Sequence, residues 1–247
     1  MGLESVFPDY NAWAEKGFEG LICPKPTVMI AFSPRTGSTH LCEVLHHAGQ
    51  GRVPTEIFNP RGPAEKERNL RGVGSFAAYF QSFASDSDEV FIFKTCWLDA
   101  APFASALTRM FPSLRVVYLS MRNDAAQAVS AFKAELTGTW HVHQGGVEAR
   151  RVQEGQFSME RLLALHAAQA RERQGWAQWF AVQGVKPLAM QYEEFERDIN
   201  AGLRKLVMEL GLGLRTEVPA NVGMRKLADQ TSFEWTLGLQ RRLLNLS

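Results

Sequence analysis

The sequence predicts an α/β domain with a central, mainly parallel sheet flanked by helices. Two observations lead to this prediction. Short apolar runs recur along the chain, and most are followed by a stretch compatible with a helix. The first run and its helix are joined by a turn that contains glycine, as at the start of a βαβ unit. No internal repeat, low-complexity tract or linker divides the 247 residues, so one domain is the simplest organisation.

The predicted strands cover residues 27–32, 90–94, 115–119 and 185–191. The first three are rich in apolar and β-branched residues, as expected of strands buried on both faces of a sheet. The fourth contains Pro187, which favours an edge position or a strand start.

Helices are expected at residues 41–49, 99–111, 123–137, 158–180 and 193–210. In the last of these, Leu203, Leu206, Val207 and Leu210 recur at the spacing of an amphipathic helix. Residues 137–156 are rich in glycine and charge and have no clear period, so a loop is expected there.

The charge balance limits the classes of partner. The chain has 27 Lys and Arg against 26 Asp and Glu, a net charge of +1. A general nucleic-acid-binding protein needs a strongly basic surface, so that class is disfavoured, and no polybasic membrane tether is present. No segment reaches the roughly 20 apolar residues of a membrane span, and the N-terminus does not resemble a signal peptide. Cys23, Cys42 and Cys96 are too few for a disulfide framework and fit a reducing compartment, so we expect a cytoplasmic protein.

Residues 33–39 (SPRTGST), which we call the anion loop, lie between the first strand and the first helix. Backbone N–H groups can converge there on an anion, helped by the positive end of the helix dipole. Ser38 and Thr39 add hydroxyl donors and Arg35 a charged planar fork, although Ser and Thr also suit an ordinary N-cap. The nucleotide-triphosphatase motif GxxxxGK[ST] would require Gly at Phe32 and Lys at Ser38, so hydrolysis of ATP or GTP is disfavoured.

A second anion site is expected beyond the strand at residues 115–119. Arg122 follows the carboxyl end of that strand, and Ser130 lies two helical turns further on. Both can face one phosphate in the crevice where open α/β sheets bind ligands. Taken alone, such residues are more often a surface arginine and a helix serine.

Together, the two segments resemble the signature regions of sulfotransferases that use 3′-phosphoadenosine-5′-phosphosulfate (PAPS). More closely, the sequence resembles the bacterial trehalose 2-sulfotransferase and lipopolysaccharide sulfotransferase family. The matching pieces, in the family's order, are SPRTGSTHL, PTEIF (54–58), FKTCW (93–97), RNDAAQAVS with TGTW (137–140), GWAQWF (175–180) and ADQTSFEW (228–235). This resemblance implies a P-loop-like sulfotransferase fold over residues 27–247, preceded by an N-terminal extension of residues 1–26.

The resemblance also implies how the donor is held. The 5′-phosphosulfate would lie on the anion loop, and Arg122 with Ser130 would bind the 3′-phosphate. Arg225 and Lys226, which precede ADQTSFEW, would add a contact to the nucleotide. The complete set implied for the donor is Ser33, Arg35, Thr36, Gly37, Ser38, Thr39, Arg122, Ser130, Arg225 and Lys226.

Three residues are predicted to be catalytic: Glu56, Lys94 and Arg35. Glu56 matches the family's proposed catalytic carboxylate and would accept the proton of the acceptor hydroxyl. Lys94 is expected to end its strand and point toward the crevice, where it would neutralise the bridging oxygen as the leaving phosphate gains charge. The alternative for Lys94 is a solvated lysine at a strand end. The transfer is expected to be in line, to leave 3′,5′-ADP and to need no metal.

The acceptor is harder to predict than the donor. Phe58, Trp140 and His141 are candidate substrate contacts, whereas Trp176 and Trp179, three apart on a helix, are expected in the core. His141 and His143 have no Cys or acidic partner at ligand spacing, so a metal site is not expected there.

Val53 stands where trehalose-sulfating relatives carry a glutamate, so trehalose is disfavoured. A carbohydrate, a glycolipid or another small hydroxylated molecule is expected instead. The family also implies a homodimer. Two alternatives stay open: a small-molecule kinase of P-loop type and a non-catalytic nucleotide-binding protein.

Overall fold

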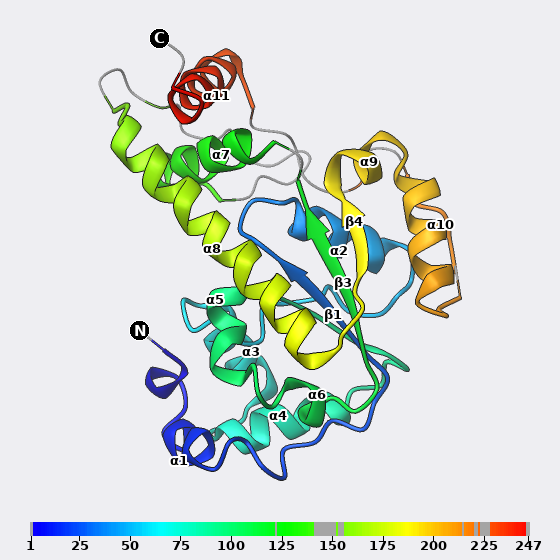
Figure 1. Ribbon diagram of the computed structural model, residues 1–247. Coiled ribbons are helices and arrows are strands. Elements are labelled where there is room, and N and C mark those ends of the chain that lie inside the picture. The colour runs from blue at the N-terminus through cyan, green and yellow to red at the C-terminus, as the bar shows by residue number, and fades with distance from the viewer. Residues whose placement is uncertain are drawn as a thin grey trace.

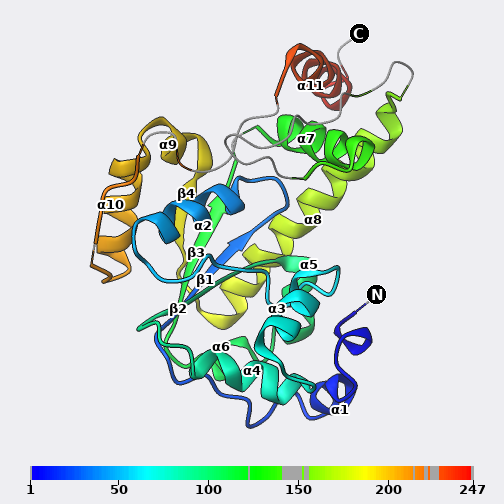
Figure 2. The same cartoon turned by 180° about the vertical axis from the view of Figure 1, so that it is seen from behind.

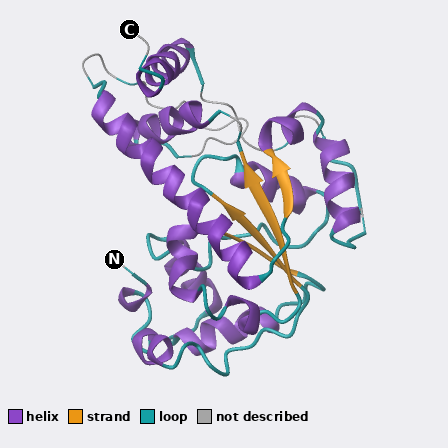
Figure 3. Ribbon diagram, viewed as in Figure 1, coloured by secondary structure: helices purple, strands orange, loops and turns teal. Residues whose placement is uncertain are grey.

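A computed structural model describes residues 2–121, 123–140, 152, 156–213, 215–219, 222 and 228–245. Within these residues the centre is an all-parallel sheet of four strands in the order β2-β1-β3-β4. The strands are β1 (Thr27–Phe32), β2 (Phe91–Cys96), β3 (Leu114–Ser120) and β4 (Leu188–Gln191). Helices surround the sheet (Figure 3). The predicted α/β class with a parallel sheet is therefore confirmed.

The register aligns the carboxyl ends of the three longer strands. Phe32 at the end of β1 pairs with Cys96 of β2 on one side and with Leu119 of β3 on the other. All six residues of β1 and of β2 are buried, as expected of strands covered on both faces. β2 continues two residues beyond the predicted end, so Lys94 lies inside the strand opposite Ile30 and does not end it.

Alternate residues of the strands build two cores, one on each face of the sheet. On one face, Met29 and Phe93 pack in the same cluster as Trp176 and Trp179 of the long helix α8 (Met159–Gln183). On the other face, Val28, Ile30 and Phe32 of β1 pack with α2 (Ser38–His47) and α10 (Ile199–Glu209). α8 crosses the front of the sheet in Figure 1, and Figure 2 shows α2 on the opposite side.

A third cluster joins the C-terminal helix α11 (Gln230–Leu243) to α7 (Asp124–Thr137) and α8. Asp229 caps α11 together with Ser232, and Lys133 of α7 donates to both of these residues, at 2.7 Å to Asp229 and 2.9 Å to Ser232. The motif ADQTSFEW thus ties the C-terminal helix to the helix that carries Ser130.

Two predicted helices are interrupted. The stretch 99–111 forms α5 (Trp97–Ala100), a 3-10 turn at Ala101–Phe103 and α6 (Leu107–Met110). Pro102 lies in this stretch, and a proline has no N–H to donate inside a helix. The stretch 193–210 forms α9 (Tyr192–Arg197) and α10, because Asp198 is extended and its side chain caps α10 by accepting from the N–H of Ala201.

The sequence patterns predicted α2 but missed the other helices before β2. They are a 3-10 turn at Leu3–Ser5, α1 (Tyr10–Glu15), α3 (Pro63–Arg71) and α4 (Phe76–Ala84). Phe7, Tyr10 and Phe18 contact the ring of Phe76 in α4 and belong to the core under the sheet. Phe7, Tyr10 and Phe18 of the predicted extension therefore pack into the core of the domain, while the family boundary at residue 27 stays a prediction.

The three cysteines are free and buried. In the part of the chain that the structure describes, no helix is both long and apolar enough to cross a membrane.

Candidate active site

The anion loop has an unusual backbone. Arg35 and Gly37 have φ angles of 72° and 78°, in the left-handed region that residues with a Cβ rarely adopt. A Cβ on Gly37 would lie 2.1 Å from Cε2 of Tyr192, so glycine is required there by both space and backbone angle. α2 begins immediately after Gly37, and no described side chain caps its N-terminus. The first N–H groups of α2 are therefore available to an anion.

The hydroxyl groups of the loop have two different surroundings. Thr36 is fully buried and donates to the carbonyl oxygen of Ser33 (3.0 Å), so it stabilises the turn. The Ser33 hydroxyl is also buried and accepts from Gln127 (2.9 Å). Thr39, by contrast, is half-buried and accepts from Lys94 (2.8 Å). All three residues were predicted to bind PAPS, but only the hydroxyl of Thr39 contacts the side chain of a predicted catalytic residue, Lys94.

Arg35 connects the two predicted anion sites. Its Nε donates to Oγ of Ser130 on α7 (3.0 Å), and its Nη1 donates to the carbonyl oxygen of Trp140. Burial lowers the pKa of the Arg35 guanidinium, although an arginine stays charged in a protein. A strained backbone that aims a charged side chain is common at functional sites.

Glu56 and Lys94 form an ion pair next to the anion loop. Nζ of Lys94 lies 3.3 Å from Oε1 of Glu56 and 2.8 Å from Oγ1 of Thr39. Lys94 is only 6% exposed, and its Nζ lies 5.6 Å from the centre of the Phe32 ring. The other oxygen of Glu56 accepts from the side-chain amide of Asn59 (2.6 Å). Three distant segments thus place a carboxylate, an ammonium and a hydroxyl in one contact chain.

The segment that carries Glu56 is fixed to the edge strand of the sheet. The N–H of Lys94 donates to the carbonyl oxygen of Thr55 (3.0 Å), one residue before Glu56. Further back along the segment, Arg52 reaches the carboxylates of Glu67 (3.3 Å) and Asp86 (3.7 Å).

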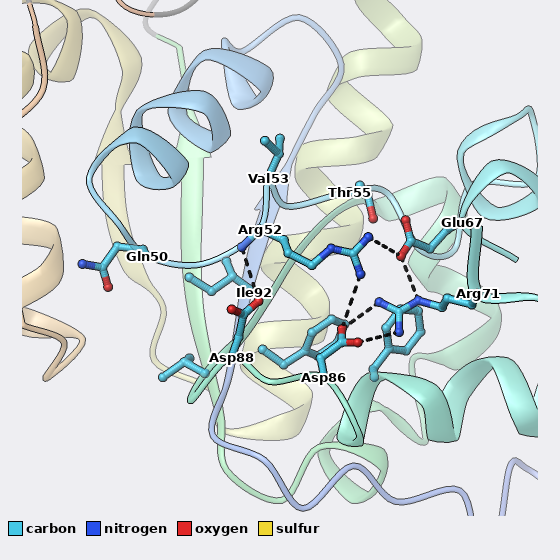
Figure 4. Close-up of a pocket in the computed structure, with 12 residues that line it drawn as sticks. Gln50, Arg52, Val53, Thr55, Glu67, Arg71, Asp86, Asp88 and Ile92 are labelled. Carbon is cyan, nitrogen blue, oxygen red and sulfur yellow. Dashed lines mark hydrogen bonds and ion pairs between the residues drawn. The ribbon is translucent and has the colours of Figure 1, made fainter. Parts of the chain in front are cut away.

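The side chains of Arg52, Glu67, Asp86 and Arg71 surround a cavity of about 30 Å³ (Figure 4). Arg71 pairs with both Glu67 and Asp86 at 2.8 and 2.7 Å, as the dashed lines show. The cavity is far smaller than the roughly 300–1,000 Å³ of small-molecule sites, so we regard it as structural. The ion pairs around it anchor the residues that lead to Glu56.

A second charged group lies at the end of β2 and was not predicted. Arg61 donates to both carboxylate oxygens of Asp99, each at 2.8 Å, and Asp99 is 6% exposed. The thiol of Cys96 also donates to Asp99 (3.2 Å). Burial raises the pKa of Asp99, and Arg61 opposes that rise. The N–H of Arg61 donates to Asn59 (2.9 Å), so this group is connected to Glu56 through one residue.

Glu172 of α8 holds α5, the short helix that carries Asp99. Its carboxylate accepts from the N–H groups of Trp97 (2.6 Å) and Leu98 (3.0 Å). Burial raises the pKa of Glu172 from 4.5 to about 7, although the two N–H bonds oppose the rise.

The raised pKa predicts how Glu172 affects stability with pH. The folded protein binds this proton more tightly than the unfolded chain does. The stabilising contribution is therefore complete below about pH 4.5 and is lost as the pH rises through about 7. We expect the difference in unfolding free energy between the wild type and Glu172→Gln to fall by about 3 kcal/mol from pH 4 to pH 8. Urea unfolding at several pH values measures it. The exposed Glu160→Gln on the same helix is the control, and a difference that does not change with pH would contradict the prediction.

The remaining predicted residues lie in different surroundings. Phe58 is 1% exposed and its ring stacks on Phe103 with centroids 4.2 Å apart, so it is a core residue and cannot contact an acceptor as predicted. Trp140 is 47% exposed and remains a candidate contact. Trp176 and Trp179 are buried, which confirms the predicted core role. The predicted residues outside the described part of the chain are Arg122, His141, Arg225 and Lys226.

Two residues that hold the anion loop were missed by the sequence analysis. The ring of Tyr192 packs on Gly37, and its hydroxyl lies 3.0 Å from Nδ1 of His40 in the first turn of α2. Gln127 of α7 donates to Ser33 and to the carbonyl oxygen of Pro34 (2.7 Å). Gln127 stands inside the quoted motif RNDAAQAVS, so its place in the sequence was the available signal. Among the described residues, no three His, Cys, Asp or Glu side chains gather as they would around a metal ion.

Comparison with known proteins identifies what the chain resembles. The sequence model described as Stf0 sulphotransferase matches residues 101–241, more than half of the chain. No curated protein matches the sequence. The structure is similar to that of a sulfotransferase from Alicyclobacillus acidocaldarius, with a TM-score of 0.53 and 15% identity over 90% of this chain and 97% of that one.

Two further solved structures give TM-scores of 0.49. The sulfotransferase domain of the Synechococcus PCC 7002 olefin synthase is 14% identical, over 92% of this chain and 90% of that one. Mouse sulfotransferase SULT7A1, complexed with PAP, is 12% identical, over 92% and 67%. At this identity, the Alicyclobacillus structure shows the fold alone, which is the P-loop-like sulfotransferase fold expected from the sequence.

Proposed function

Since the chain belongs to the Stf0 sulphotransferase family, we propose that it transfers a sulfuryl group from PAPS to a hydroxyl group of a carbohydrate, a glycolipid or another small acceptor. The single observation that carries the proposal is the contact chain Glu56–Lys94–Thr39 beside the anion loop. It combines a carboxylate, a cation and a hydroxyl group at the carboxyl edge of a parallel sheet, where such sheets bind ligands.

The residues around the anion loop fit an anionic donor. The uncapped N-terminus of α2 supplies N–H groups, and Arg35 and Lys94 supply two cations. The donor would bring the sulfuryl group and a phosphate leaving group. Ser130, which we assign to the 3′-phosphate, hydrogen-bonds to Arg35 of the loop, so the two assigned anion sites adjoin each other. Arg122, Arg225 and Lys226 complete the set that we assign to the nucleotide.

In the proposed mechanism, Glu56 accepts the proton of the acceptor hydroxyl as that oxygen forms its bond to sulfur. The bond between sulfur and the bridging phosphate oxygen breaks on the opposite side, and Lys94 neutralises the charge that the oxygen gains. Asn59 holds the second oxygen of Glu56 and so orients the carboxylate. Arg35 adds positive charge at the loop and takes no part in proton transfer.

The family disfavours the two alternatives that the sequence left open. A P-loop kinase would carry its lysine within the loop, whereas Lys94 comes from β2. A non-catalytic nucleotide-binding protein would have no need of a base beside the loop.

A binding experiment tests the donor. We expect 3′,5′-ADP to raise the melting temperature of the protein, because a ligand that binds only the folded state stabilises it. ATP with Mg²⁺ is the comparison ligand, and a larger shift with ATP than with 3′,5′-ADP would contradict the proposal. Sulfur-labelled PAPS, incubated with a panel of sugars and lipids, then identifies acceptors by mass.

Three further parts of the proposal concern the acceptor, the oligomeric state and the location of the enzyme in the cell. Val53 disfavours trehalose as the acceptor, and Trp140 is a candidate contact for another one. We propose a homodimer and a cytoplasmic location. Light scattering of the purified protein measures the first, and fractionation of the source cells the second.

A further inference from the structure

Gln127 is a buried polar residue that the proposed mechanism does not use. It lies in the first turn of α7 and is 1% exposed. Its Nε2 donates two hydrogen bonds to the anion loop, one to Oγ of Ser33 (2.9 Å) and one to the carbonyl oxygen of Pro34 (2.7 Å). A single amide nitrogen therefore holds two consecutive residues of the loop.

The same face of α7 holds the next residue of the loop. Ser130 lies three residues after Gln127, a spacing that places both side chains on one side of a helix. Its hydroxyl accepts from Nε of Arg35 (3.0 Å). Residues 33, 34 and 35 are thus each fixed to α7.

These contacts give Gln127 a position between two parts of the proposed donor site. Under the proposed function, the loop binds the 5′-phosphosulfate, whereas Ser130 of α7 binds the 3′-phosphate. We propose that Gln127 is a positioning residue that sets the spacing between the 5′ and 3′ anion sites of the donor. A ligand with phosphates at both ends gains from two sites only when their separation matches its own.

The chemistry of the side chain agrees with this role. The carbonyl oxygen of Pro34 needs a donor, which an amide nitrogen supplies and a carboxylate or thioether does not. Oε1 of Gln127 is buried and has no hydrogen-bond partner among the described residues. A buried amide that leaves one atom unpaired lowers the stability of the fold. A role in holding the anion loop through its nitrogen explains why a glutamine is nevertheless buried here.

The test compares ligands that occupy one site or both. Dissociation constants for 3′,5′-ADP, 5′-AMP and 3′-AMP are measured by calorimetry for the wild type and for Gln127→Ala. We expect the variant to bind 3′,5′-ADP at least about tenfold more weakly and to bind each monophosphate within about threefold of the wild type, because only the bisphosphate depends on the spacing.

Gln169→Ala is a matched control. Gln169 is a buried glutamine of α8, 3% exposed, and neither of its side-chain polar atoms has a partner among the described residues. We expect this variant to bind all three ligands as the wild type does. Gln127→Met keeps the volume of the side chain but removes its hydrogen-bond donor, and we expect the same loss of affinity for 3′,5′-ADP. It replaces Gln127→Ala in the test if the alanine variant folds poorly.

Three outcomes would contradict the inference or the proposed function. An equal loss for 3′,5′-ADP and 5′-AMP would overturn the inference, because Gln127 would then support the loop alone. Unchanged affinity for 3′,5′-ADP in both Gln127 variants would overturn it as well. Failure of the wild type to bind 3′,5′-ADP would instead overturn the proposed function on which the inference rests.

Discussion

Replacing Glu56 by glutamine is expected to lower kcat for sulfuryl transfer by about 10²–10⁴-fold, the usual contribution of a general base. Glutamine keeps the shape of the side chain and can still accept from Asn59, but it cannot take the proton of the acceptor hydroxyl. Affinity for 3′,5′-ADP is not expected to fall, because Glu56 contacts Lys94 and no residue assigned to the nucleotide is lost.

The measurement uses labelled PAPS and an acceptor found in the proposed panel, with calorimetry for 3′,5′-ADP. Glu65→Gln is the control, since Glu65 lies on α3 with 58% of its side chain exposed. Full activity in Glu56→Gln would show that another group takes the proton. A large loss of nucleotide affinity would show that Glu56 acts in binding.

Replacing Lys94 by methionine is expected to reduce kcat by about 10²–10³-fold, as when a group that stabilises charge in the transition state is removed. Methionine fills similar space, so the buried position in β2 stays occupied. Glu56 loses its cation, and Thr39 loses its donor.

The double variant separates this effect from that of Glu56. Because the two side chains touch, we expect the loss in Glu56→Gln/Lys94→Met to be much smaller than the product of the two single losses. The exposed Lys66→Met on α3 is the control. Losses that multiply would contradict a shared role, as would a Lys94→Met enzyme with full activity.

Much of the fold follows from patterns that are local in the sequence. β1 has the predicted bounds, and β2 and β3 lie within two residues of them, because a short apolar run between turn residues has few other structures to adopt. Helix breaks are less visible. Asp198 looks like an ordinary polar residue of an amphipathic helix, and only its extended backbone shows that it starts a new one.

The candidate site likewise contains residues that sequence motifs predicted and residues that they missed. Glu56 and Lys94 were predicted from separate motifs, and the structure brings their side chains together. Gln127 and Tyr192 were missed because Ser33 in the anion loop lies 94 residues from Gln127, and His40 in α2 lies 152 residues from Tyr192. Contacts over such distances in the sequence leave no periodic signal. Phe58 was misplaced since a motif next to Glu56 does not tell which way an aromatic side chain points.

The hydrogen bond from the N–H of Lys94 to Thr55 has a consequence for solubility. β2 is an outer strand, and an uncovered outer strand can recruit a strand from another molecule and begin aggregation. The segment before Glu56 covers β2 at this point. The proposed base is therefore carried by the same stretch of chain that shields the sheet from self-association. A sequence change that lifts this stretch away from β2 would impair solubility and turnover together.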